Sequence, residues 1–396
     1  MLRGQDILCV SSIDWEFNWQ GHQEIMSTFA AAGNRVLFIE NTGVRTPRWR
    51  DLPRLRKRLG SRLKSRSGFQ EVRKNLWVYS PMALPFPSVA GVQRVNGRWL
   101  AGSVNRWMNS VGFRNPLFWT FLPTGLTLEL MDRIPHSLAV YYLIADFEKL
   151  ADVPERIRRT EKNLLQECDL IFAQGEELKA RCAPFLEKVH IFPFGVQFEL
   201  FERTRMNGQG IPPPMRPLRR PIIGYAGGLH KHMDFQLIRA AAAMRPDWTF
   251  LLIGPELTDL SSLRGIKNLV LLGEKPFSDL PAYMNGFDVG LIPYLLSGYT
   301  KTVYPTKLNE YHALGKPVVS TPLPEVVSYN RRYDSLVYLA QEKEEFVGKI
   351  EEALRNGDRQ EAVQRRIGAA KENSWTGRIE QMSRLIEQRW QENRAS

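Results

Sequence analysis

A lysine and a glutamate lie three residues apart in the stretch Tyr304–Thr321, which reads YPTKLNEYHALGKPVVST. The pattern predicts a turn, a short helix over Lys307–Leu314 that ends at a glycine, and a strand over Pro317–Ser320. At this spacing, Lys307 and Glu310 share one face of the helix. A cation at a helix start suits a phosphate, and a carboxylate accepts paired hydroxyl hydrogen bonds. The stretch therefore suggests a site for a nucleotide sugar.

A glycine pair stands in a second place that suits a phosphate. Gly227 and Gly228 follow a predicted strand, Ile222–Ala226, and precede a predicted helix, Asp234–Met244. Glycines there let the backbone approach a phosphate closely, although the same pair could form only a tight strand-to-helix turn. Lys231 is either a second cation for this site or a solvated loop lysine.

The first half of the chain offers candidates in the loop after its first strand and at one strand end. The loop holds Asp14, Trp15, Trp19, Gln20, Gly21 and His22. Its tryptophans are either a packed lid or platforms on which a sugar stacks. His22 opens a helix, where the dipole favours the neutral imidazole, so it could act as a base, contact a phosphate or cap the helix. Asp146 follows the strand Leu138–Ile144 and is a candidate acceptor contact or general base.

The histidines and cysteines do not predict a metal site or a disulfide framework. His230, His232 and His312 lack a clear further ligand at metal-binding spacing. The three cysteines are widely spaced and odd in number: Cys9, Cys168 and Cys182. We therefore expect a reducing, cytoplasmic environment.

Positive charge is concentrated in one segment of the 396-residue chain, whose formal net charge is +12. Residues 45–66 contain ten Arg or Lys residues and one acid. Apolar residues recur there at helical spacing, at Trp49, Leu52, Leu55, Leu59 and Leu63. The segment is either a solvated helix packed by its leucines or an interfacial helix on anionic lipid. Nucleic-acid binding is not expected, because no recognition motif accompanies the charge.

Strands and helices alternate along the chain, which predicts an α/β fold of parallel sheets. The first βαβ unit comprises a strand at Asp6–Val10, a helix at His22–Ala32 and a strand at Arg35–Glu40. Further elements of the first half are predicted at 77–80, 117–122, 138–144, 154–167, 170–173, 176–181 and 189–192. The pattern restarts with elements at 222–226, 234–244, 249–253, 269–272, 278–285 and 288–292. Residues 342–396 are almost entirely helical in pattern, with Trp375 between two helices.

Length and composition predict two domains of about 200 residues each. We expect an N-terminal domain over 1–202 with a basic insert at 45–68, a linker rich in proline, glycine and cations at 203–220, and a C-terminal domain over 221–375. A last helix, 376–396, could cross back to the first domain. No stretch is apolar enough to span a membrane, and the N-terminus lacks a signal-peptide layout.

Four blocks of the second half carry a family resemblance: IIGYAGGLHKHMDFQLI, DWTFLLIGP, FDVGLIPY and YPTKLNEYHALGKPVVST. Together they resemble the donor-binding domain of GT-B-fold glycosyltransferases, most of all the group 1 or family 4 type of bacterial cell-surface polysaccharide biosynthesis. The first half is similar at DILCVSSIDWEFNWQGHQEIM, RVLFIENTG, LAVYYLIADF and VHIFPFGVQFELF. The resemblance covers most of the chain, except the basic insert and parts of 81–115.

The resemblance implies two doubly wound Rossmann-like domains facing across a cleft, with C-terminal helices. It implies transfer of a sugar from a nucleoside-diphosphate sugar, generally without an essential metal ion or other cofactor. The implied donor-binding residues are Gly227, Gly228, Lys231, Gly254, Pro293, Tyr304, Thr306, Lys307, Leu308 and Glu310. Asp146 and His22 are then the catalytic candidates, and Asp14, Trp15, Trp19 and Gln20 lie on the acceptor side.

The sequence departs from the family at one position of a two-glutamate motif. Glu310 matches the second glutamate, which generally binds the donor ribose, but Thr302 stands where the first is expected. A non-catalytic scaffold that binds a sugar nucleotide therefore stays open beside the enzyme, as does a sugar-nucleotide epimerase. The expected partners are a nucleotide-sugar donor, a glycan or lipid-linked acceptor, and an anionic membrane surface through 45–68. The expected place is the inner face of the plasma membrane, with peripheral attachment.

Overall fold

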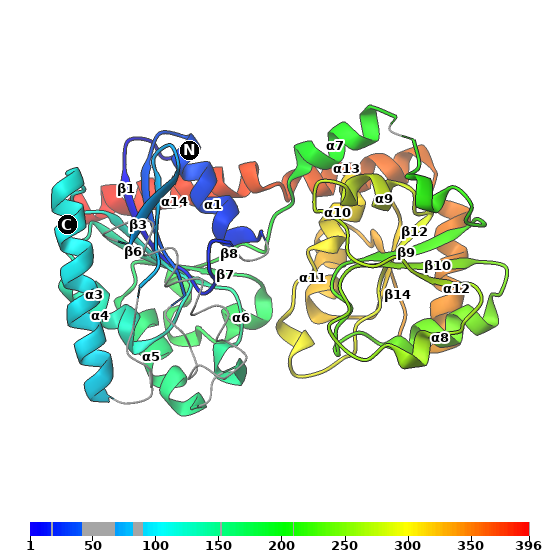
Figure 1. The fold of residues 1–396 in the computed structure, drawn as a ribbon, viewed down its shortest axis with the longest axis horizontal. Helices are drawn as coiled ribbons and strands as arrows, with labels where there is room; N and C mark the ends of the chain where they lie inside the picture. The colour runs from blue at the N-terminus through cyan, green and yellow to red at the C-terminus, as the bar shows by residue number, and fades with distance from the viewer. Residues whose placement is uncertain (17–18, 42–67, 82–89, 151–152, 209, 396) are drawn as a thin grey trace. The chain divides into compact units, whose positions relative to one another are not determined.

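The chain folds into two compact α/β units (Figure 1). The computed structural model describes residues 1–16, 19–41, 68–81, 90–150, 153–208 and 210–395. The first unit comprises Met1–Pro193 together with Arg378–Ser396, and the second comprises Phe194–Gly377. Apart from its last residue, the basic insert predicted at 45–68 lies outside the described residues.

An eight-stranded sheet forms the centre of the first unit, in the order β3-β4-β2-β1-β5-β6-β7-β8. Its strands are β1 (Asp6–Val10), β2 (Arg35–Ile39), β3 (Phe69–Arg73), β4 (Leu76–Tyr79), β5 (Leu117–Thr120), β6 (Leu138–Leu143), β7 (Leu170–Ala173) and β8 (Val189–Ile191). All neighbours pair in parallel except β3, which is antiparallel to β4 at one edge. The parallel strands read as continuous apolar runs because helices cover both faces of the sheet.

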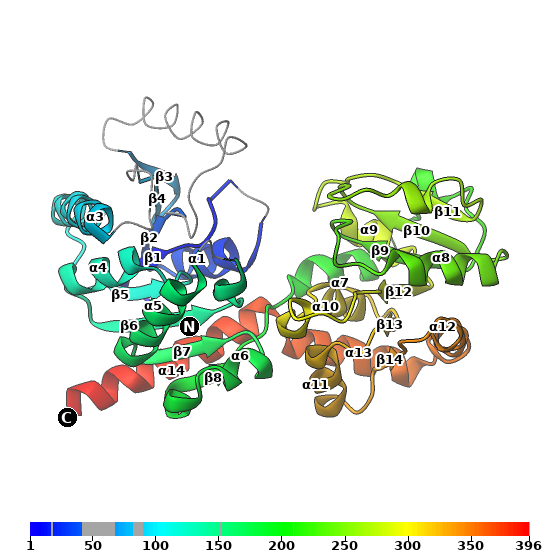
Figure 2. The ribbon, with the colours of Figure 1, turned by 90° about the horizontal axis from the view of Figure 1, so that it is seen from below.

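Helices cover the two faces of this sheet (Figures 1 and 2). They are α1 (Gly21–Ala31), α3 (Ala90–Val111), α4 (Gly125–Arg133), α5 (Pro154–Glu167), α6 (Glu176–Ala180) and the last helix, α14 (Trp375–Ala395). α3, α4 and α5 share a core with one face of the sheet. α1 packs on the other face, where Phe29 meets Trp119 edge to face at 5.9 Å.

The second unit has a six-stranded, fully parallel sheet in the order β11-β10-β9-β12-β13-β14. Its strands are β9 (Ile222–Ala226), β10 (Thr249–Ile253), β11 (Leu269–Leu271), β12 (Val289–Ile292), β13 (Val318–Ser320) and β14 (Val337–Leu339). The chain leaves β9 toward β10 and β11 and then returns to place β12 on the other side of β9. Strand order therefore reverses between β9 and β12, and a crevice at the carboxyl ends of two such strands is where ligands bind in open α/β sheets.

Helices also cover both faces of the second sheet. They are α7 (Phe198–Met206), α8 (Phe235–Met244), α9 (Leu280–Asn285), α10 (Lys307–Ala313), α11 (Pro324–Arg332), α12 (Lys343–Asn356) and α13 (Gln360–Glu372). α8 packs beside α12 on one face, and α10 packs beside α13 and α7 on the other (Figure 1).

The division between the units differs from the predicted linker at 203–220. The second unit begins at Phe194, so α7 packs against α9 and α10 rather than on the first sheet. Phe198 and Phe201 are buried in the core of the second unit, which explains why the boundary precedes the proline-rich stretch. The last residues, from Arg378 onward, belong to the first unit, as expected for a helix that crosses back. Among the helices that the structure describes, none is long and apolar enough to cross a membrane.

Candidate functional site

Two loops meet at the point where strand order reverses in the second unit. Gly227 and Gly228 follow β9, and Pro293 follows β12. The backbone N–H of Asp234 donates to the carbonyl of Pro293 at 2.7 Å, and that of Leu295 donates to the carbonyl of His232 at 2.8 Å. These hydrogen bonds hold the glycine-containing turn and the loop after β12 together as one surface.

The glycines of this surface allow main-chain segments and a lysine to come very close. A Cβ atom on Gly254 would lie 1.9 Å from the carbonyl oxygen of Gly227. A Cβ atom on Gly227 would lie 2.3 Å from Cε and 2.9 Å from Nζ of Lys307. The lysine of α10 therefore lies directly over the glycine turn after β9, where only a residue without a side chain leaves it room.

Lys307 has no ion-pair partner among the residues that the structure describes, and Glu310 has no hydrogen-bond or ion-pair partner there. Both side chains are half-buried and begin in the first turn of α10. Burial raises the pKa of the Glu310 carboxyl, and the positive charge of Lys307 opposes that rise. A cation beside a glycine turn, with a carboxylate in the same turn of the helix, is suited to a ligand that carries both phosphate and hydroxyl groups.

Three tyrosine hydroxyls, which the sequence analysis did not single out, support this surface from below. The Tyr225 hydroxyl donates to the carbonyl of Gly228 at 3.1 Å and lies 3.3 Å from the Tyr294 hydroxyl. The Tyr311 hydroxyl accepts from the backbone N–H of Ala226 at 3.1 Å. Burial raises the pKa of both Tyr225 and Tyr311, so these hydroxyls stay protonated near neutral pH. The sequence did contain one signal for this arrangement. Tyr225 lies in a run predicted to be a buried strand, and a buried tyrosine hydroxyl requires a hydrogen-bond partner.

The remaining predicted donor residues divide between surface and core. Lys231 is exposed, whereas Leu308 is fully buried in the core. The Tyr304 hydroxyl accepts from Asn309 at 2.9 Å within a buried pair. Thr306 precedes α10 as its N-cap residue but makes no side-chain capping hydrogen bond.

Thr302 ends a short 3-10 helix, Thr300–Thr302, that precedes α10. Its hydroxyl donates to the carbonyl of Tyr299 at 3.2 Å. The side chain at the position of the family's first glutamate is therefore bonded to its own turn.

Histidines of the second unit do not gather around a common point. His312 is fully buried, and its Nδ1 lies 2.8 Å from the Tyr329 hydroxyl. The rings of His230 and His232 lie 5.6 Å apart, and His232 stacks on Tyr299 at 4.2 Å. Within the described parts of the chain, no group of three or more His, Cys, Asp or Glu residues is arranged to hold a metal ion.

In the first unit, His22 is buried rather than open to a substrate. It is 1% exposed, and its ring lies 4.0 Å from that of Phe121. Its Nε2 lies 2.9 Å from Oγ of Ser12, and burial lowers its pKa to about 3. The imidazole is therefore neutral near pH 7, as predicted, but the cause is burial rather than the dipole of the helix that His22 opens. Its position argues against direct contact with a substrate and leaves Ser12 as the more accessible member of the pair.

Asp146 is engaged in an ionic network, which argues against the predicted role as a general base. Its two carboxylate oxygens lie 2.6 Å from Arg181 and 3.1 Å from Lys149. Arg181 also binds Glu161 at 2.9 Å, and Glu161 accepts from the Tyr141 hydroxyl. The aspartate does follow β6 as predicted, but its partner Arg181 comes from the end of α6, which periodicity could not indicate.

The aromatic loop after β1 packs onto its own unit. Trp15 and Trp19 meet edge to face at 5.7 Å, and Nε1 of Trp19 donates to Glu24 at 2.6 Å. The backbone N–H of Gln20 donates to Oε1 of Gln23 at 3.0 Å as α1 begins. Asp14, like both tryptophans, is half-buried. Arg73 lies over the Trp19 ring at 4.8 Å, and Trp15 meets Phe38 edge to face at 5.1 Å, so the packing favours the lid interpretation of these residues.

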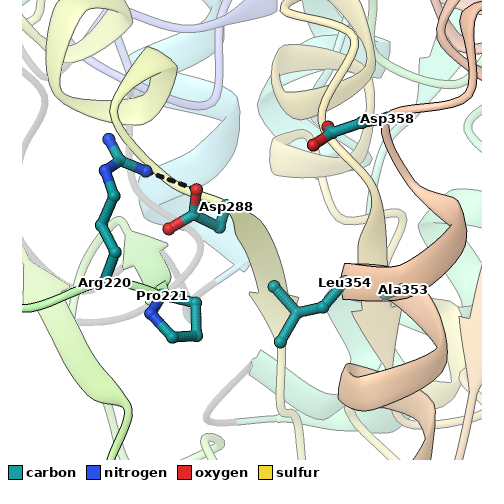
Figure 3. Close-up of a pocket in the computed structure, with 6 residues that line it drawn as sticks. All are labelled: Arg220, Pro221, Asp288, Ala353, Leu354 and Asp358. Carbon is teal, nitrogen blue, oxygen red and sulfur yellow. Dashed lines mark hydrogen bonds and ion pairs between the residues drawn. The ribbon is translucent and has the colours of Figure 1, made fainter.

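A separate pocket of about 290 Å³ lies at the opposite edge of the second sheet (Figure 3). Arg220, Pro221 and Asp288 precede β9 and β12, and Leu354 of α12 closes one side. Arg220 and Asp288 form an ion pair within it. Because it lies at the amino ends of the strands, this pocket is not part of the surface around Gly227 and Lys307.

Comparison with known proteins matches the second unit to a family. Residues 220–356 match the sequence model of the family described as glycosyl transferases group 1. The curated "Putative teichuronic acid biosynthesis glycosyltransferase TuaH" of Bacillus subtilis (strain 168) is 32% identical over 219 residues. That match covers 51% of this chain and 53% of the relative, so the chain spans about half the length of the curated relative that it matches.

Solved structures share the fold over nearly the whole chain. A glycosyltransferase from Rickettsia africae ESF-5 has a TM-score of 0.67 at 11% identity and covers 97% of this chain and 98% of its own. A UDP-forming α,α-trehalose-phosphate synthase from Burkholderia vietnamiensis has a TM-score of 0.67 at 12% identity, with coverages of 98% and 99%. HepE of Anabaena in complex with UDP has a TM-score of 0.64 at 13% identity, with coverages of 97% and 100%. At these identities the likeness is one of fold.

Proposed function

We infer that this chain, which has the GT-B fold and belongs through residues 220–356 to the group 1 glycosyltransferases, transfers a sugar from a nucleoside-diphosphate sugar. The acceptor is a glycan or a lipid-linked glycan of cell-surface polysaccharide biosynthesis, as the name of the B. subtilis relative suggests. One observation carries the proposal: Lys307 lies over Gly227, where strand order reverses, and Glu310 begins in the same turn of α10 without an ion-pair partner among the described residues.

These residues suit the two ends of a nucleoside diphosphate. Lys307 would neutralise the diphosphate, whose negative charge grows as the bond between its oxygen and the anomeric carbon breaks. Glu310 would accept hydrogen bonds from ribose hydroxyls, and the main chain at Gly227 and Gly228 would allow a phosphate to approach. Because a lysine can supply the neutralising charge, we propose that transfer needs no metal ion. The rate should then be unchanged by EDTA.

Uridine nucleotides are the first donors to test, because HepE, which shares the fold, was solved with UDP and with UDP-glucose. A thermal-shift screen of nucleoside diphosphates and their sugars should raise the melting temperature with one nucleobase family, since a ligand that binds only the folded state stabilises it. Lys307→Ala and Glu310→Ala should abolish the shift and the transfer of sugar while the protein stays folded. Lys267→Ala, which changes an exposed lysine of the same unit, is the matched control. Normal transfer by either site variant would refute the assignment.

A second candidate is a scaffold that binds a sugar nucleotide without turnover. It is favoured by Thr302, whose hydroxyl is bonded to its own turn where the family carries a glutamate. Donor hydrolysis or transfer by the purified protein would exclude the scaffold. A ligand-induced thermal shift with no turnover across a broad panel of acceptors would support it.

We also propose that the protein is attached peripherally to the cytoplasmic face of the membrane through residues 45–68. The support is the sequence of this segment, with ten cations and one acid in 45–66. Deleting 48–66 should lower binding to anionic vesicles, because each cation near such a surface adds about 1 kcal/mol of attraction. Undiminished binding would show that another surface is responsible.

A further inference from the structure

The outer face of α3 has an unusual composition for a solvated helix. Five residues exposed along it are Arg94, Val95, Arg98, Trp99 and Arg106, and we call them the α3 face. Val95 is 55% exposed and Trp99 is 43% exposed. They stand four residues apart and are therefore neighbours on the helix surface. Isolated exposed apolar residues are common, but this pair is flanked on both turns by arginines.

The inner face of the same helix fixes which side is turned outward. Leu100, Val104 and Met108 are buried in the core of the first unit. A Cβ atom on Gly97 would lie 2.7 Å from Cβ of Glu129, so α3 presses closely on α4 there. Figure 2 shows α3 beside α4 at the margin of this unit. Because the opposite side of α3 is packed against the core and against α4, the α3 face points to solvent.

Charge distinguishes α3 from the other long helices. It contains no Asp or Glu in 22 residues, whereas α5, α12, α13 and α14 each carry both acids and bases. Within the described residues, Arg94, Arg98 and Arg106 form no ion pair with a carboxylate. Glu129 beneath the helix is already paired with Arg133 at 3.1 Å. Three uncompensated arginines thus share one surface with an exposed tryptophan.

We propose that the α3 face binds the surface of an anionic lipid bilayer. Arginine heads would contact lipid phosphates, while Trp99 and Val95 would enter the region between headgroups and acyl chains, where tryptophan is enriched. A helix of this kind lies on a membrane rather than across it, in agreement with the absence of a spanning helix among those described. The inference rests on the proposed attachment to a membrane but not on residues 45–68, which belong to a different segment.

A fluorescent probe at position 95 tests the contact directly. The three native cysteines are buried, so a cysteine introduced by Val95→Cys can be labelled selectively with a polarity-sensitive dye. The emission should shift to the blue on vesicles of phosphatidylcholine and phosphatidylglycerol, but not on phosphatidylcholine alone. Met244→Cys, 43% exposed on α8 in the second unit, is the matched control and should not shift. Protein that sediments with vesicles while the dye at position 95 stays unshifted would overturn the proposal. A shift that depends on protein concentration without vesicles would also overturn it, because a second copy would then cover the face.

Charge reversal gives an independent readout. The double variant R94E/R98E should lower the vesicle partition coefficient at least about tenfold, because two attractive charges become repulsive. The control R239E/R355E makes the same charge change at exposed positions of the second unit and should change partition much less. Equal effects of the two variants would refute the α3 face. The UDP-induced thermal shift should be unchanged in R94E/R98E, so a failure of donor binding is recognised separately from a failure of membrane contact.

Discussion

Lys307 and Glu310 occupy one turn of α10, yet burial affects the two charges differently. The Glu310 pKa is raised by burial, against the opposing charge of Lys307. An ionised carboxylate that the folded protein partly desolvates lowers stability, and such a cost at a binding site is common because the ligand supplies the missing partners. The proposed ribose hydroxyls would be those partners.

The variant Glu310→Gln should therefore separate stability from binding. With its pKa raised in the folded state, Glu310 favours folding most at low pH, and this contribution is lost as pH rises through the folded pKa. At pH 7.5 the variant should melt about 1–3 °C above the wild type, and the difference should vanish toward pH 4.5. Donor affinity should fall because the amide accepts fewer hydroxyl hydrogen bonds. Calorimetric melting and donor titration over this pH range measure both effects. A variant that melts below the wild type at pH 7.5 would contradict this account.

His22 should contribute to acid sensitivity without entering the chemistry. Burial lowers its pKa to about 3, so the unfolded chain takes up a proton from about pH 6.5 downward while the folded protein does not. This difference should remove about 2 kcal/mol of stability by pH 5. His22→Gln should lose less stability than the wild type between pH 7 and pH 5 in urea titrations, while its rate of sugar transfer at pH 7.5 should stay within a few-fold. Equal acid sensitivity of the two proteins would rule this out.

At the residue scale, two of the candidate donor residues of the second unit, Lys307 and Gly227, do lie together in the structure, whereas the surroundings of the first-unit candidates could not be predicted. Lys307, Glu310 and Gly227 could be predicted because a short helix and a glycine turn set their chemistry locally. Asp146 could not be interpreted alone, because Arg181, 35 positions later, binds it after folding. The burial of His22 could not be predicted, because it depends on Phe121, a residue at the end of a different strand.

At the scale of elements, two glycines with different neighbours let the chain after β9 and the chain after β10 come close together. Gly254→Ala would place Cβ against the rigid carbonyl of Gly227, whereas Gly227→Ala would meet the flexible end of Lys307. We expect Gly254→Ala to cost about 2–4 kcal/mol of stability. Gly227→Ala should cost about 1–3 kcal/mol, because its φ of +154° is one that residues with a side chain rarely adopt, and it should displace Lys307 and reduce transfer strongly. Gly102→Ala, with open space around its Cβ, is the control. Urea unfolding and transfer assays on the three variants measure both effects. A Gly227→Ala variant as active as the wild type would contradict the expected displacement of Lys307.

Elements with a strong local pattern were predicted closely, and elements defined by their neighbours were not. β1, β7, β9 and β10 begin and end where the apolar runs indicate. β3 was missed because FQEVR is an exposed edge strand without a continuous apolar run. α3 was missed because glycine and asparagine interrupt its helical pattern, and only packing on α4 makes it a helix.

At the scale of the whole molecule, composition predicted a boundary between the two units close to the observed one, but it did not indicate the helix that lies between the two positions. The prolines and cations of 203–220 do indicate irregular chain, but α7 and the buried Phe198 and Phe201 join the second unit before it. The periodicity of the tail predicted its helices, whereas the return of the last helix to the first unit, from Arg378 onward, was only one possibility that the sequence left open. Long-range packing of this kind has no local signature in the chain.

The last helix should be required for the first unit and dispensable for donor binding. Ile379, Met382 and Ile386 of α14 are fully buried, and Trp390 donates to Ser137 at 3.2 Å. Burying three such side chains contributes about 5–9 kcal/mol, which is comparable with the stability of a whole domain. Ending the chain at Gly377 should therefore unfold the first unit.

In that truncated protein, proteolysis should remove Met1–Pro193, while Phe194–Gly377 remains folded and still melts at a higher temperature with UDP. Deleting only 391–396 is the control, because residues 391–395 are exposed and their loss should leave melting unchanged. Mass spectrometry of the proteolytic fragments distinguishes the outcomes. If the truncated chain resisted proteolysis throughout, α14 would not be part of the first unit's stability. If it lost the UDP response, the nucleotide site would extend beyond the second unit.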